Sequence, residues 1–167
     1  FPNTYIHISR PAVVLEFGGG YERVEVIPAY AAENHDVGMR YKIPGVTTEW
    51  MDSTPKAHLD YVNGSNKAPV QGGAKGLARL LKAWKYYRNV PISSFYLEMR
   101  AAEYMRDQKS LVYYMDLYYV LKRLKSHDLA AMNDPTGKTG RITACSSNAN
   151  FTDARSKLST AVSRAKR

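Results

Sequence analysis

The sequence predicts an α+β chain in which a β-hairpin and a long irregular connection precede a bundle of helices. Three observations support this prediction. Two apolar, β-branched runs flank a cluster of three glycines near the start, and residues 31–74 are rich in Pro, Gly and Asn. From Lys75 onward the apolar residues repeat with the period of an α-helix. We therefore expect two parts, residues 1–74 and residues 75–167.

The hairpin is predicted from residues 12–17 and 21–30, because a glycine cluster between two strand-like runs is typical of a tight turn. No helix follows these glycines directly, so they do not form a phosphate-binding loop. Side chains alternate along a strand, which places Glu25 on the same face as Arg23. Pro28 should end the ladder, because proline has no backbone N–H to donate.

The connection that follows the hairpin is predicted to be mostly irregular over residues 31–74. Short edge strands are expected at 41–44 and 48–50, and a helical turn within 55–63. A stretch of this length with little regular structure is usually functional or packed by its own side chains.

The first two predicted helices follow this connection. The first begins at Lys75 and is broken at residues 89–91, where a proline disfavours helical geometry in the residue before it. Either Ser93 or Ser94 can cap the second helix, over about 94–107, by accepting a hydrogen bond from a backbone N–H.

Two more helices are predicted, over 109–125 and from near Thr152 onward, with a turn at 133–137 between them. The expected core positions of these two helices are Leu111, Met115, Tyr118, Leu121 and Leu124 in the first and Ala154, Leu158, Ala161 and Ala165 in the second.

Charge is distributed unevenly along the 167 residues, whose formal net charge is +9. Residues 1–60 carry five Lys and Arg against eight Asp and Glu, whereas residues 75–125 carry eleven against four. A basic helical part indicates an anionic partner, such as nucleotide phosphates, nucleic acid or a membrane surface, or else a solvated face without a ligand. No run approaches the ~20 apolar residues of a membrane span. Cys145 is the single cysteine, which excludes an intramolecular disulfide and favours a reducing, cytoplasmic location.

Glu25 is the first residue of possible chemical interest, because it lies mid-strand between two valines. A buried carboxylate needs a partner, and a metal ion is one such partner. The alternative is a glutamate on the solvated face of the sheet, and position alone favours that alternative. The four histidines show no metal-ligand spacing and are interpreted as surface or packing residues; they are His7, His35, His58 and His127.

A second group lies at the start of the helical part. Lys82 is offset from the apolar stripe of its helix, Ser94 is near a helix N-terminus that attracts anions, and Phe95 offers a face for base stacking. Together these three could hold a nucleoside triphosphate. Taken one by one, they are equally consistent with a surface lysine, a helix cap and a core phenylalanine.

Four segments, in this order, give the chain a resemblance to a known family, the CD-NTases, which are bacterial relatives of cyclic GMP-AMP synthase and oligoadenylate synthetase. The segments are residues 24–30 (VEVIPAY), 50–58 (WMDSTPKAH), 78–85 (ARLLKAWK) and 92–98 (ISSFYLE). Asp134-Pro135 and residues 157–161 fit the end of such a domain. The resemblance covers nearly the whole chain.

This resemblance implies a fold and a reaction. The fold is the C-terminal strands of a nucleotidyltransferase core, residues 1–74, followed by a helical nucleotide-binding bundle, residues 75–167. The reaction is nucleotidyl transfer with Mg²⁺ (or Mn²⁺) and with ATP or another nucleoside triphosphate as substrate. The resemblance implies that Glu25, where many relatives have Asp, is a catalytic metal ligand. It implies that three further residues bind the nucleotide: Lys82, Ser94 and Phe95.

The sequence has no Gly-Ser that is followed by an acidic pair, the motif that the family places upstream. We therefore expect that the chain is the C-terminal part of an enzyme that makes cyclic di- or oligonucleotide second messengers in anti-phage signalling. This part is expected to be inactive without the missing N-terminal part. A regulatory protein partner is also possible by resemblance. The alternative from another class is a basic helical module that binds nucleic acid and has no chemistry.

Overall fold

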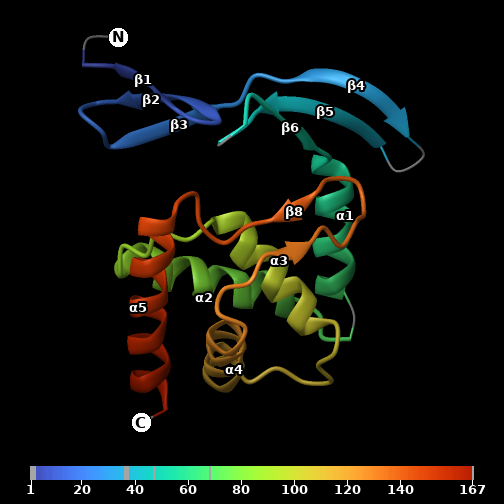
Figure 1. Cartoon of the computed structure of the whole chain (residues 1–167). Helices are drawn as coiled ribbons and strands as arrows, with labels where there is room; N and C mark the ends of the chain where they lie inside the picture. The colour runs from blue at the N-terminus through green and yellow to red at the C-terminus, as the bar shows by residue number, and fades with distance from the viewer. Residues whose placement is uncertain (1–2, 36–37, 47, 68, 167) are drawn as a thin grey trace. The chain divides into compact units, whose positions relative to one another are not determined.

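The computed structural model describes residues 3–35, 38–46, 48–67 and 69–166 (Figure 1). The chain divides into two compact units. We call residues 1–57 with 137–140 the strand unit, and residues 58–136 with 141–167 the helical unit. Within the described residues, no helix is long and apolar enough to cross a membrane.

The strand unit contains two antiparallel sheets, each with strands in sequential order. The first sheet contains β1 (Tyr5–Ser9), β2 (Ala12–Phe17) and β3 (Glu22–Val26), and the second contains β4 (Tyr30–His35), β5 (Gly38–Pro44) and β6 (Trp50–Ser53). The predicted hairpin is confirmed as β2 and β3. All three glycines of its turn have positive φ angles, of 57°, 73° and 99°, which explains why the turn requires glycine. The ladder ends at Val26, two residues before Pro28.

The prediction of an irregular connection over residues 31–74 is wrong, because β4, β5, β6 and helix α1 (Pro55–Lys67) occupy most of it. The residues that suggested irregularity lie at the ends of elements. Pro44 ends β5, Gly45 lies in the turn that follows, and Pro55 begins α1, where its missing N–H leaves no helical bond unmade. The segment at 41–44 is also not an edge strand, since β5 is the middle strand of its sheet.

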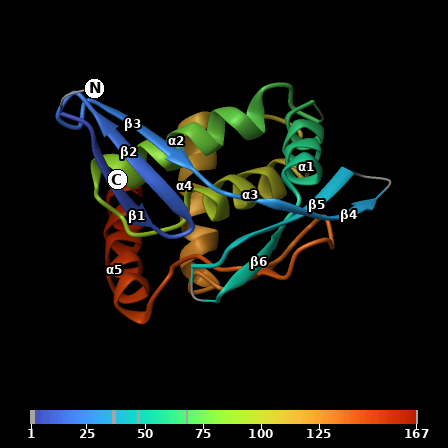
Figure 2. The same ribbon diagram turned by 90° about the horizontal axis from the view of Figure 1, so that it is seen from above.

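The helical unit packs its helices around one hydrophobic core. Besides most of α1, it contains α2 (Gly73–Tyr87), α3 (Ser94–Met105), α4 (Tyr113–Ser126), α5 (Asn148–Ala165) and the two-stranded sheet of β7 (Met132–Asn133) and β8 (Arg141–Ile142). Figures 1 and 2 show α3 in the middle of this unit, with α1 at one end and α5 at the other. Fully buried side chains at the centre of the core include Leu77, Leu81, Tyr96, Leu97, Met99 and Met105.

Helix α1 explains why the compact units and the predicted division after residue 74 differ. Its residues from His58 onward belong to the helical unit, and Val62 is buried in the helical core. The predicted α+β class is confirmed, with strands before helices in the chain.

The core stripe predicted for the helix over 109–125 is confirmed at Leu121 and Leu124 and is wrong at Met115. Met115 is exposed, and the buried positions begin at Asp116 and continue through Val120, Leu121 and Leu124. The cause is a polar contact that periodicity does not reveal: the Asp116 carboxylate accepts hydrogen bonds from the backbone N–H of Val112 and from a tyrosine of α3. In α5, Ala154 and Leu158 are buried as predicted, whereas Ala165 is exposed.

The tyrosine that binds Asp116 is Tyr104, whose hydroxyl donates at 2.6 Å. Burial, together with the hydrogen bond and the negative charge of Asp116, raises the pKa of Tyr104 well above its ordinary value of 10.0. Above pH 10 the unfolded chain therefore loses this proton while the folded chain retains it, so the free energy of unfolding falls as pH rises.

We expect Tyr104→Phe to lower the free energy of unfolding by about 1–3 kcal/mol at pH 8, because Asp116 loses a donor. The substitution should also remove part of the further loss of stability between pH 8 and pH 10.5. Urea unfolding at both pH values measures this, with Tyr114→Phe, an exposed residue of α4, as the control. Identical unfolding curves for the two variants would show that the hydrogen bond from Tyr104 to Asp116 does not stabilise the fold.

Candidate functional site

The candidate site is the junction between α2 and the N-terminal turns of α3, which holds three of the four predicted residues. Two lysines one turn apart on α2 cross-link the two helices. Lys82 forms an ion pair with Glu98, and the Nζ of Lys85 donates to the Oγ of Ser94 at 2.8 Å. Because Ser94 and Glu98 are also one turn apart, the contacts form a polar ladder along one side of α3.

The N-terminus of α3 is capped by Ser93, which decides between the two predicted caps. The Ser93 side chain accepts a hydrogen bond from the backbone N–H of Tyr96 at 3.2 Å. Ser94 is the first helical residue, so its hydroxyl lies beside the positive end of the helix dipole. The Lys82 side chain is about two-fifths exposed. A lysine ammonium, a serine hydroxyl and a helix N-terminus are groups that bind phosphate.

Phe95 is 41% exposed, so it is not a core residue. Its ring packs edge-on against the imidazole of His58 in α1, with ring centroids 4.9 Å apart and an interplanar angle of 75°. An aromatic ring that is held on one side and exposed on the other can stack on a nucleobase.

Behind Phe95, His58 is fixed by a buried carboxylate. The Nε2 of His58 is 3.0 Å from Oδ1 of Asp134, and both residues are at most 9% exposed. Asp134 also accepts hydrogen bonds from the backbone N–H and the hydroxyl of Thr136, at 2.9 and 2.7 Å. Sequence reasoning interpreted His58 only as a surface or packing residue, and its packing role is confirmed. The contact with Asp134 joins residues 76 positions apart, and no local pattern indicates it.

Glu25 lies on β3 in the strand unit, and its side chain is 53% exposed. The Nε and Nη2 atoms of Arg23 both donate to its Oε1, at 3.0 and 2.7 Å, so the two residues share a face as predicted. Among the described residues, no three His, Cys, Asp or Glu side chains lie close enough together to hold a metal ion. These residues therefore do not by themselves fit a magnesium site, and Glu25 would need ligands from elsewhere.

No family model matches the sequence, and no curated protein matches it either. Solved structures do match. The cyclic AMP-GMP synthase DncV of Vibrio cholerae, in complex with a linear intermediate, is similar with a TM-score of 0.75 and 14% identity over 99% of this chain and 48% of that one. The 3'-deoxy ATP-bound form of the Vibrio cholerae protein is similar with a TM-score of 0.77 and 14% identity over 99% of this chain and 46% of that one. Escherichia coli DncV in its 3'-deoxy GTP-bound form is similar with a TM-score of 0.74 and 15% identity over 99% of this chain and 47% of that one.

These matches define the fold. The chain has the fold of part of a dinucleotide cyclase, and the particular proteins to which it is similar are the DncV synthases of the two bacteria. The resemblance predicted from sequence segments is thus confirmed at the level of the fold. The chain spans about half the length of the structures that it matches.

Proposed function

We propose that this chain is part of a metal-dependent nucleotidyltransferase that joins nucleoside triphosphates into cyclic di- or oligonucleotide second messengers in anti-phage signalling. The observation that carries the proposal is the fold match, which extends over 98–99% of the chain with TM-scores of 0.72–0.77. The junction of α2 and α3 adds support, because it offers phosphate-binding groups next to an exposed aromatic ring.

In this proposal the helical unit binds the nucleotide. Lys82 exchanges its ion pair with Glu98 for a phosphate oxygen, and Ser94 donates its hydroxyl to the same triphosphate. Phe95 stacks on the base. Glu25 would supply one carboxylate to magnesium, and the other metal ligands would come from residues outside this sequence. The cytoplasm, where nucleoside triphosphates are available, is the proposed location.

Nucleotide binding can be tested in the full-length protein with a fluorescent ATP analogue. Lys82→Gln should weaken binding by about tenfold, since a charged hydrogen bond is worth about 1.5–3 kcal/mol. Arg164→Gln on α5 removes the same charge from an exposed position and should change nothing. If a long polynucleotide displaces the analogue far better than ATP does, and Lys82→Gln has no effect, the nucleic-acid-binding alternative replaces this proposal.

The aromatic contribution is tested separately. Phe95→Ala should weaken binding of the ATP analogue by about tenfold, because base stacking on an aromatic ring is worth about 1–3 kcal/mol. Phe95→Tyr should keep most of the affinity. Melting temperatures of both variants should remain close to that of the wild type, because the ring is partly exposed. Equal affinities for wild type and Phe95→Ala would remove Phe95 from the site.

A further inference from the structure

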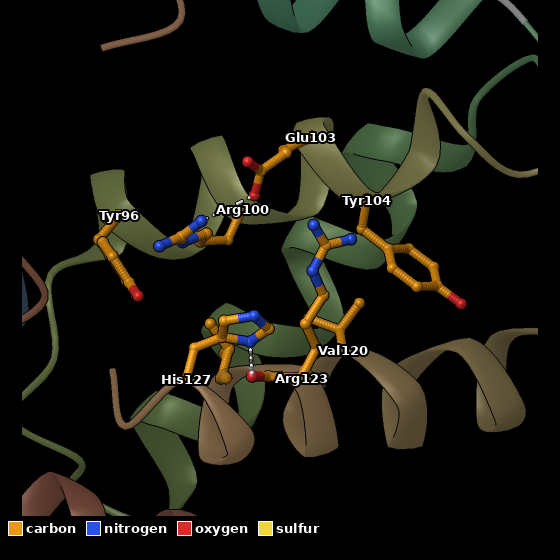
Figure 3. A pocket seen from close by; sticks show the side chains of 8 residues that line it. Tyr96, Arg100, Glu103, Tyr104, Val120, Arg123 and His127 are labelled. Carbon is orange, nitrogen blue, oxygen red and sulfur yellow. Dashed lines mark hydrogen bonds and ion pairs between the residues drawn. The ribbon is translucent and has the colours of Figure 1, made fainter. Parts of the chain in front are cut away.

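A second polar site lies in the helical unit, in a cavity of about 40 Å³ between α3 and the C-terminal half of α4 (Figure 3). Its polar lining consists mainly of Tyr96, Arg100 and Glu103 from α3 and Arg123 and His127 from the end of α4. A cavity needs only about 10–15 Å³ by this kind of measure to hold one water, so this one has room for a group of a few atoms. The cavity therefore suits one small polar group rather than a whole nucleotide.

This cavity faces away from the α2–α3 junction. Successive residues of an α-helix are 100° apart, so Ser94 and Glu98 lie within about 40° of each other around the axis of α3. Arg100 and Glu103 lie on the opposite side of the same helix. A ligand in the cavity would thus bind independently of the proposed triphosphate site.

The cavity supplies more hydrogen-bond donors than the protein uses. Arg100 donates from Nη1 to Glu103 at 2.9 Å and from Nη2 to the carbonyl of Ala130 at 2.8 Å, while its Nε is buried and has no hydrogen-bond partner in the part of the chain that the structure describes. The guanidinium of Arg123 makes no hydrogen bond or ion pair with any described residue. In Figure 3 this guanidinium reaches from α4 toward α3, and the ring of His127 lies beside Arg100.

His127 adds an imidazole ring to the lining. Its Nδ1 donates to the carbonyl of Arg123 at 2.9 Å, which leaves Nε2 without a partner among the described residues. His127 is also the C-cap of α4. Glu103 is the one carboxylate in the lining, and it is already paired with Arg100. The lining therefore contains two arginines and one carboxylate.

The chain holds Arg100 in place before any ligand binds. Asp128 and Leu129 have φ angles of 50° and 53°, a left-handed geometry that is uncommon for residues other than glycine. The carbonyl of Ala130, which directly follows this turn, accepts from the hydroxyl of Tyr96 as well as from Arg100. Preorganised donors of this kind lower the cost of binding an anion.

We propose that the cavity between α3 and α4 binds a phosphate group, held by the Arg123 guanidinium beside Arg100 and His127. A phosphate group offers several acceptor oxygens and up to two negative charges, which match the unpaired guanidinium of Arg123 and the excess of arginine over glutamate in the lining. The group is either inorganic phosphate or the terminal phosphate of a phosphomonoester whose remainder stays in solvent. This proposal does not depend on the nucleotidyltransferase assignment.

Calorimetric titration of the full-length protein with inorganic phosphate, at constant ionic strength and pH 6.5, tests the proposal. We expect saturable binding that Arg123→Gln weakens by at least about tenfold. Lys125→Gln is the matched control, because Lys125 is exposed on the same turn of α4 and does not line the cavity. Unfolding of Arg123→Gln is not expected, since Arg123 is exposed and its guanidinium makes no hydrogen bond or ion pair with the described residues.

A titration of the Lys82→Gln variant distinguishes this cavity from the α2–α3 junction. This variant should bind inorganic phosphate as tightly as the wild type does. Repeating the titration with glycerol phosphate identifies the source: binding of both compounds indicates a phosphomonoester, and binding of inorganic phosphate alone indicates the free ion. The proposal is overturned if phosphate does not bind, if Arg123→Gln binds it as well as Lys125→Gln does, or if Lys82→Gln alone abolishes binding.

Discussion

Glu25→Gln in the full-length protein should reduce formation of nucleotide product by about a thousandfold or more. A carboxylate that holds a catalytic metal ion contributes several kcal/mol to the transition state, and an uncharged amide is a much poorer ligand. The side chain is exposed and contacts only Arg23 in the described structure, so the fold should survive the substitution. Product formation from labelled ATP and GTP with Mg²⁺ measures the loss.

Two further variants make this result specific. Glu22→Gln removes another exposed carboxylate from the same strand and should leave activity unchanged. Glu25→Asp keeps a carboxylate at the position and should retain measurable activity. Full activity of Glu25→Gln would show that Glu25 is an ordinary surface glutamate paired with Arg23, as its exposure alone suggests.

Asp134→Ala should lower the free energy of unfolding of the helical unit by about 2–4 kcal/mol. The Asp134 carboxylate is buried and accepts hydrogen bonds from both the backbone and the hydroxyl of Thr136, and it contacts His58. Its removal leaves buried donors without partners, and each such donor costs about 1–3 kcal/mol. Chemical unfolding followed by far-UV circular dichroism measures the change.

Asp153→Ala is the control for this prediction, because Asp153 forms an exposed ion pair with Lys157 that should be worth less than about 1 kcal/mol. Asp134→Ala should also release His58 and with it the ring of Phe95, so ATP-analogue binding should weaken. A variant that unfolds like Asp153→Ala would show that the contact between His58 and Asp134 does not support the fold.

The features that the sequence predicts correctly are those set by neighbouring residues. Three glycines specify the hairpin turn, Ser93 specifies the start of α3, and the apolar repeat from Lys75 specifies α2. Within residues 31–74, β4 was not predicted, and β5 and β6 were predicted only as short edge strands, because a strand becomes regular by pairing with another strand. Most positions of β5 are only partly buried and lack clear alternation, so pairing with β4 and β6 defines it.

In the candidate site too, the sequence predicts residues from local patterns but does not predict their distant partners. Helix patterns identify Lys82, Ser94 and Phe95, and the structure places all three at the junction of α2 and α3. Their partners come from other elements. The burial of Asp116 in α4 was not predicted for a similar reason, since its contact with Tyr104, and not hydrophobicity, places it inside. Long-range polar contacts of this kind leave no periodic signal in the sequence.

The most direct test of the central claim is mass spectrometry of the products that the full-length protein forms from ATP and GTP with Mg²⁺. The proposed function predicts a cyclic dinucleotide or oligonucleotide that resists phosphatase and whose formation requires Glu25 and Lys82. Unchanged nucleotides, from a protein that is folded and binds long nucleic acid tightly, would contradict the claim. The chain would then have the fold of a dinucleotide cyclase without its chemistry.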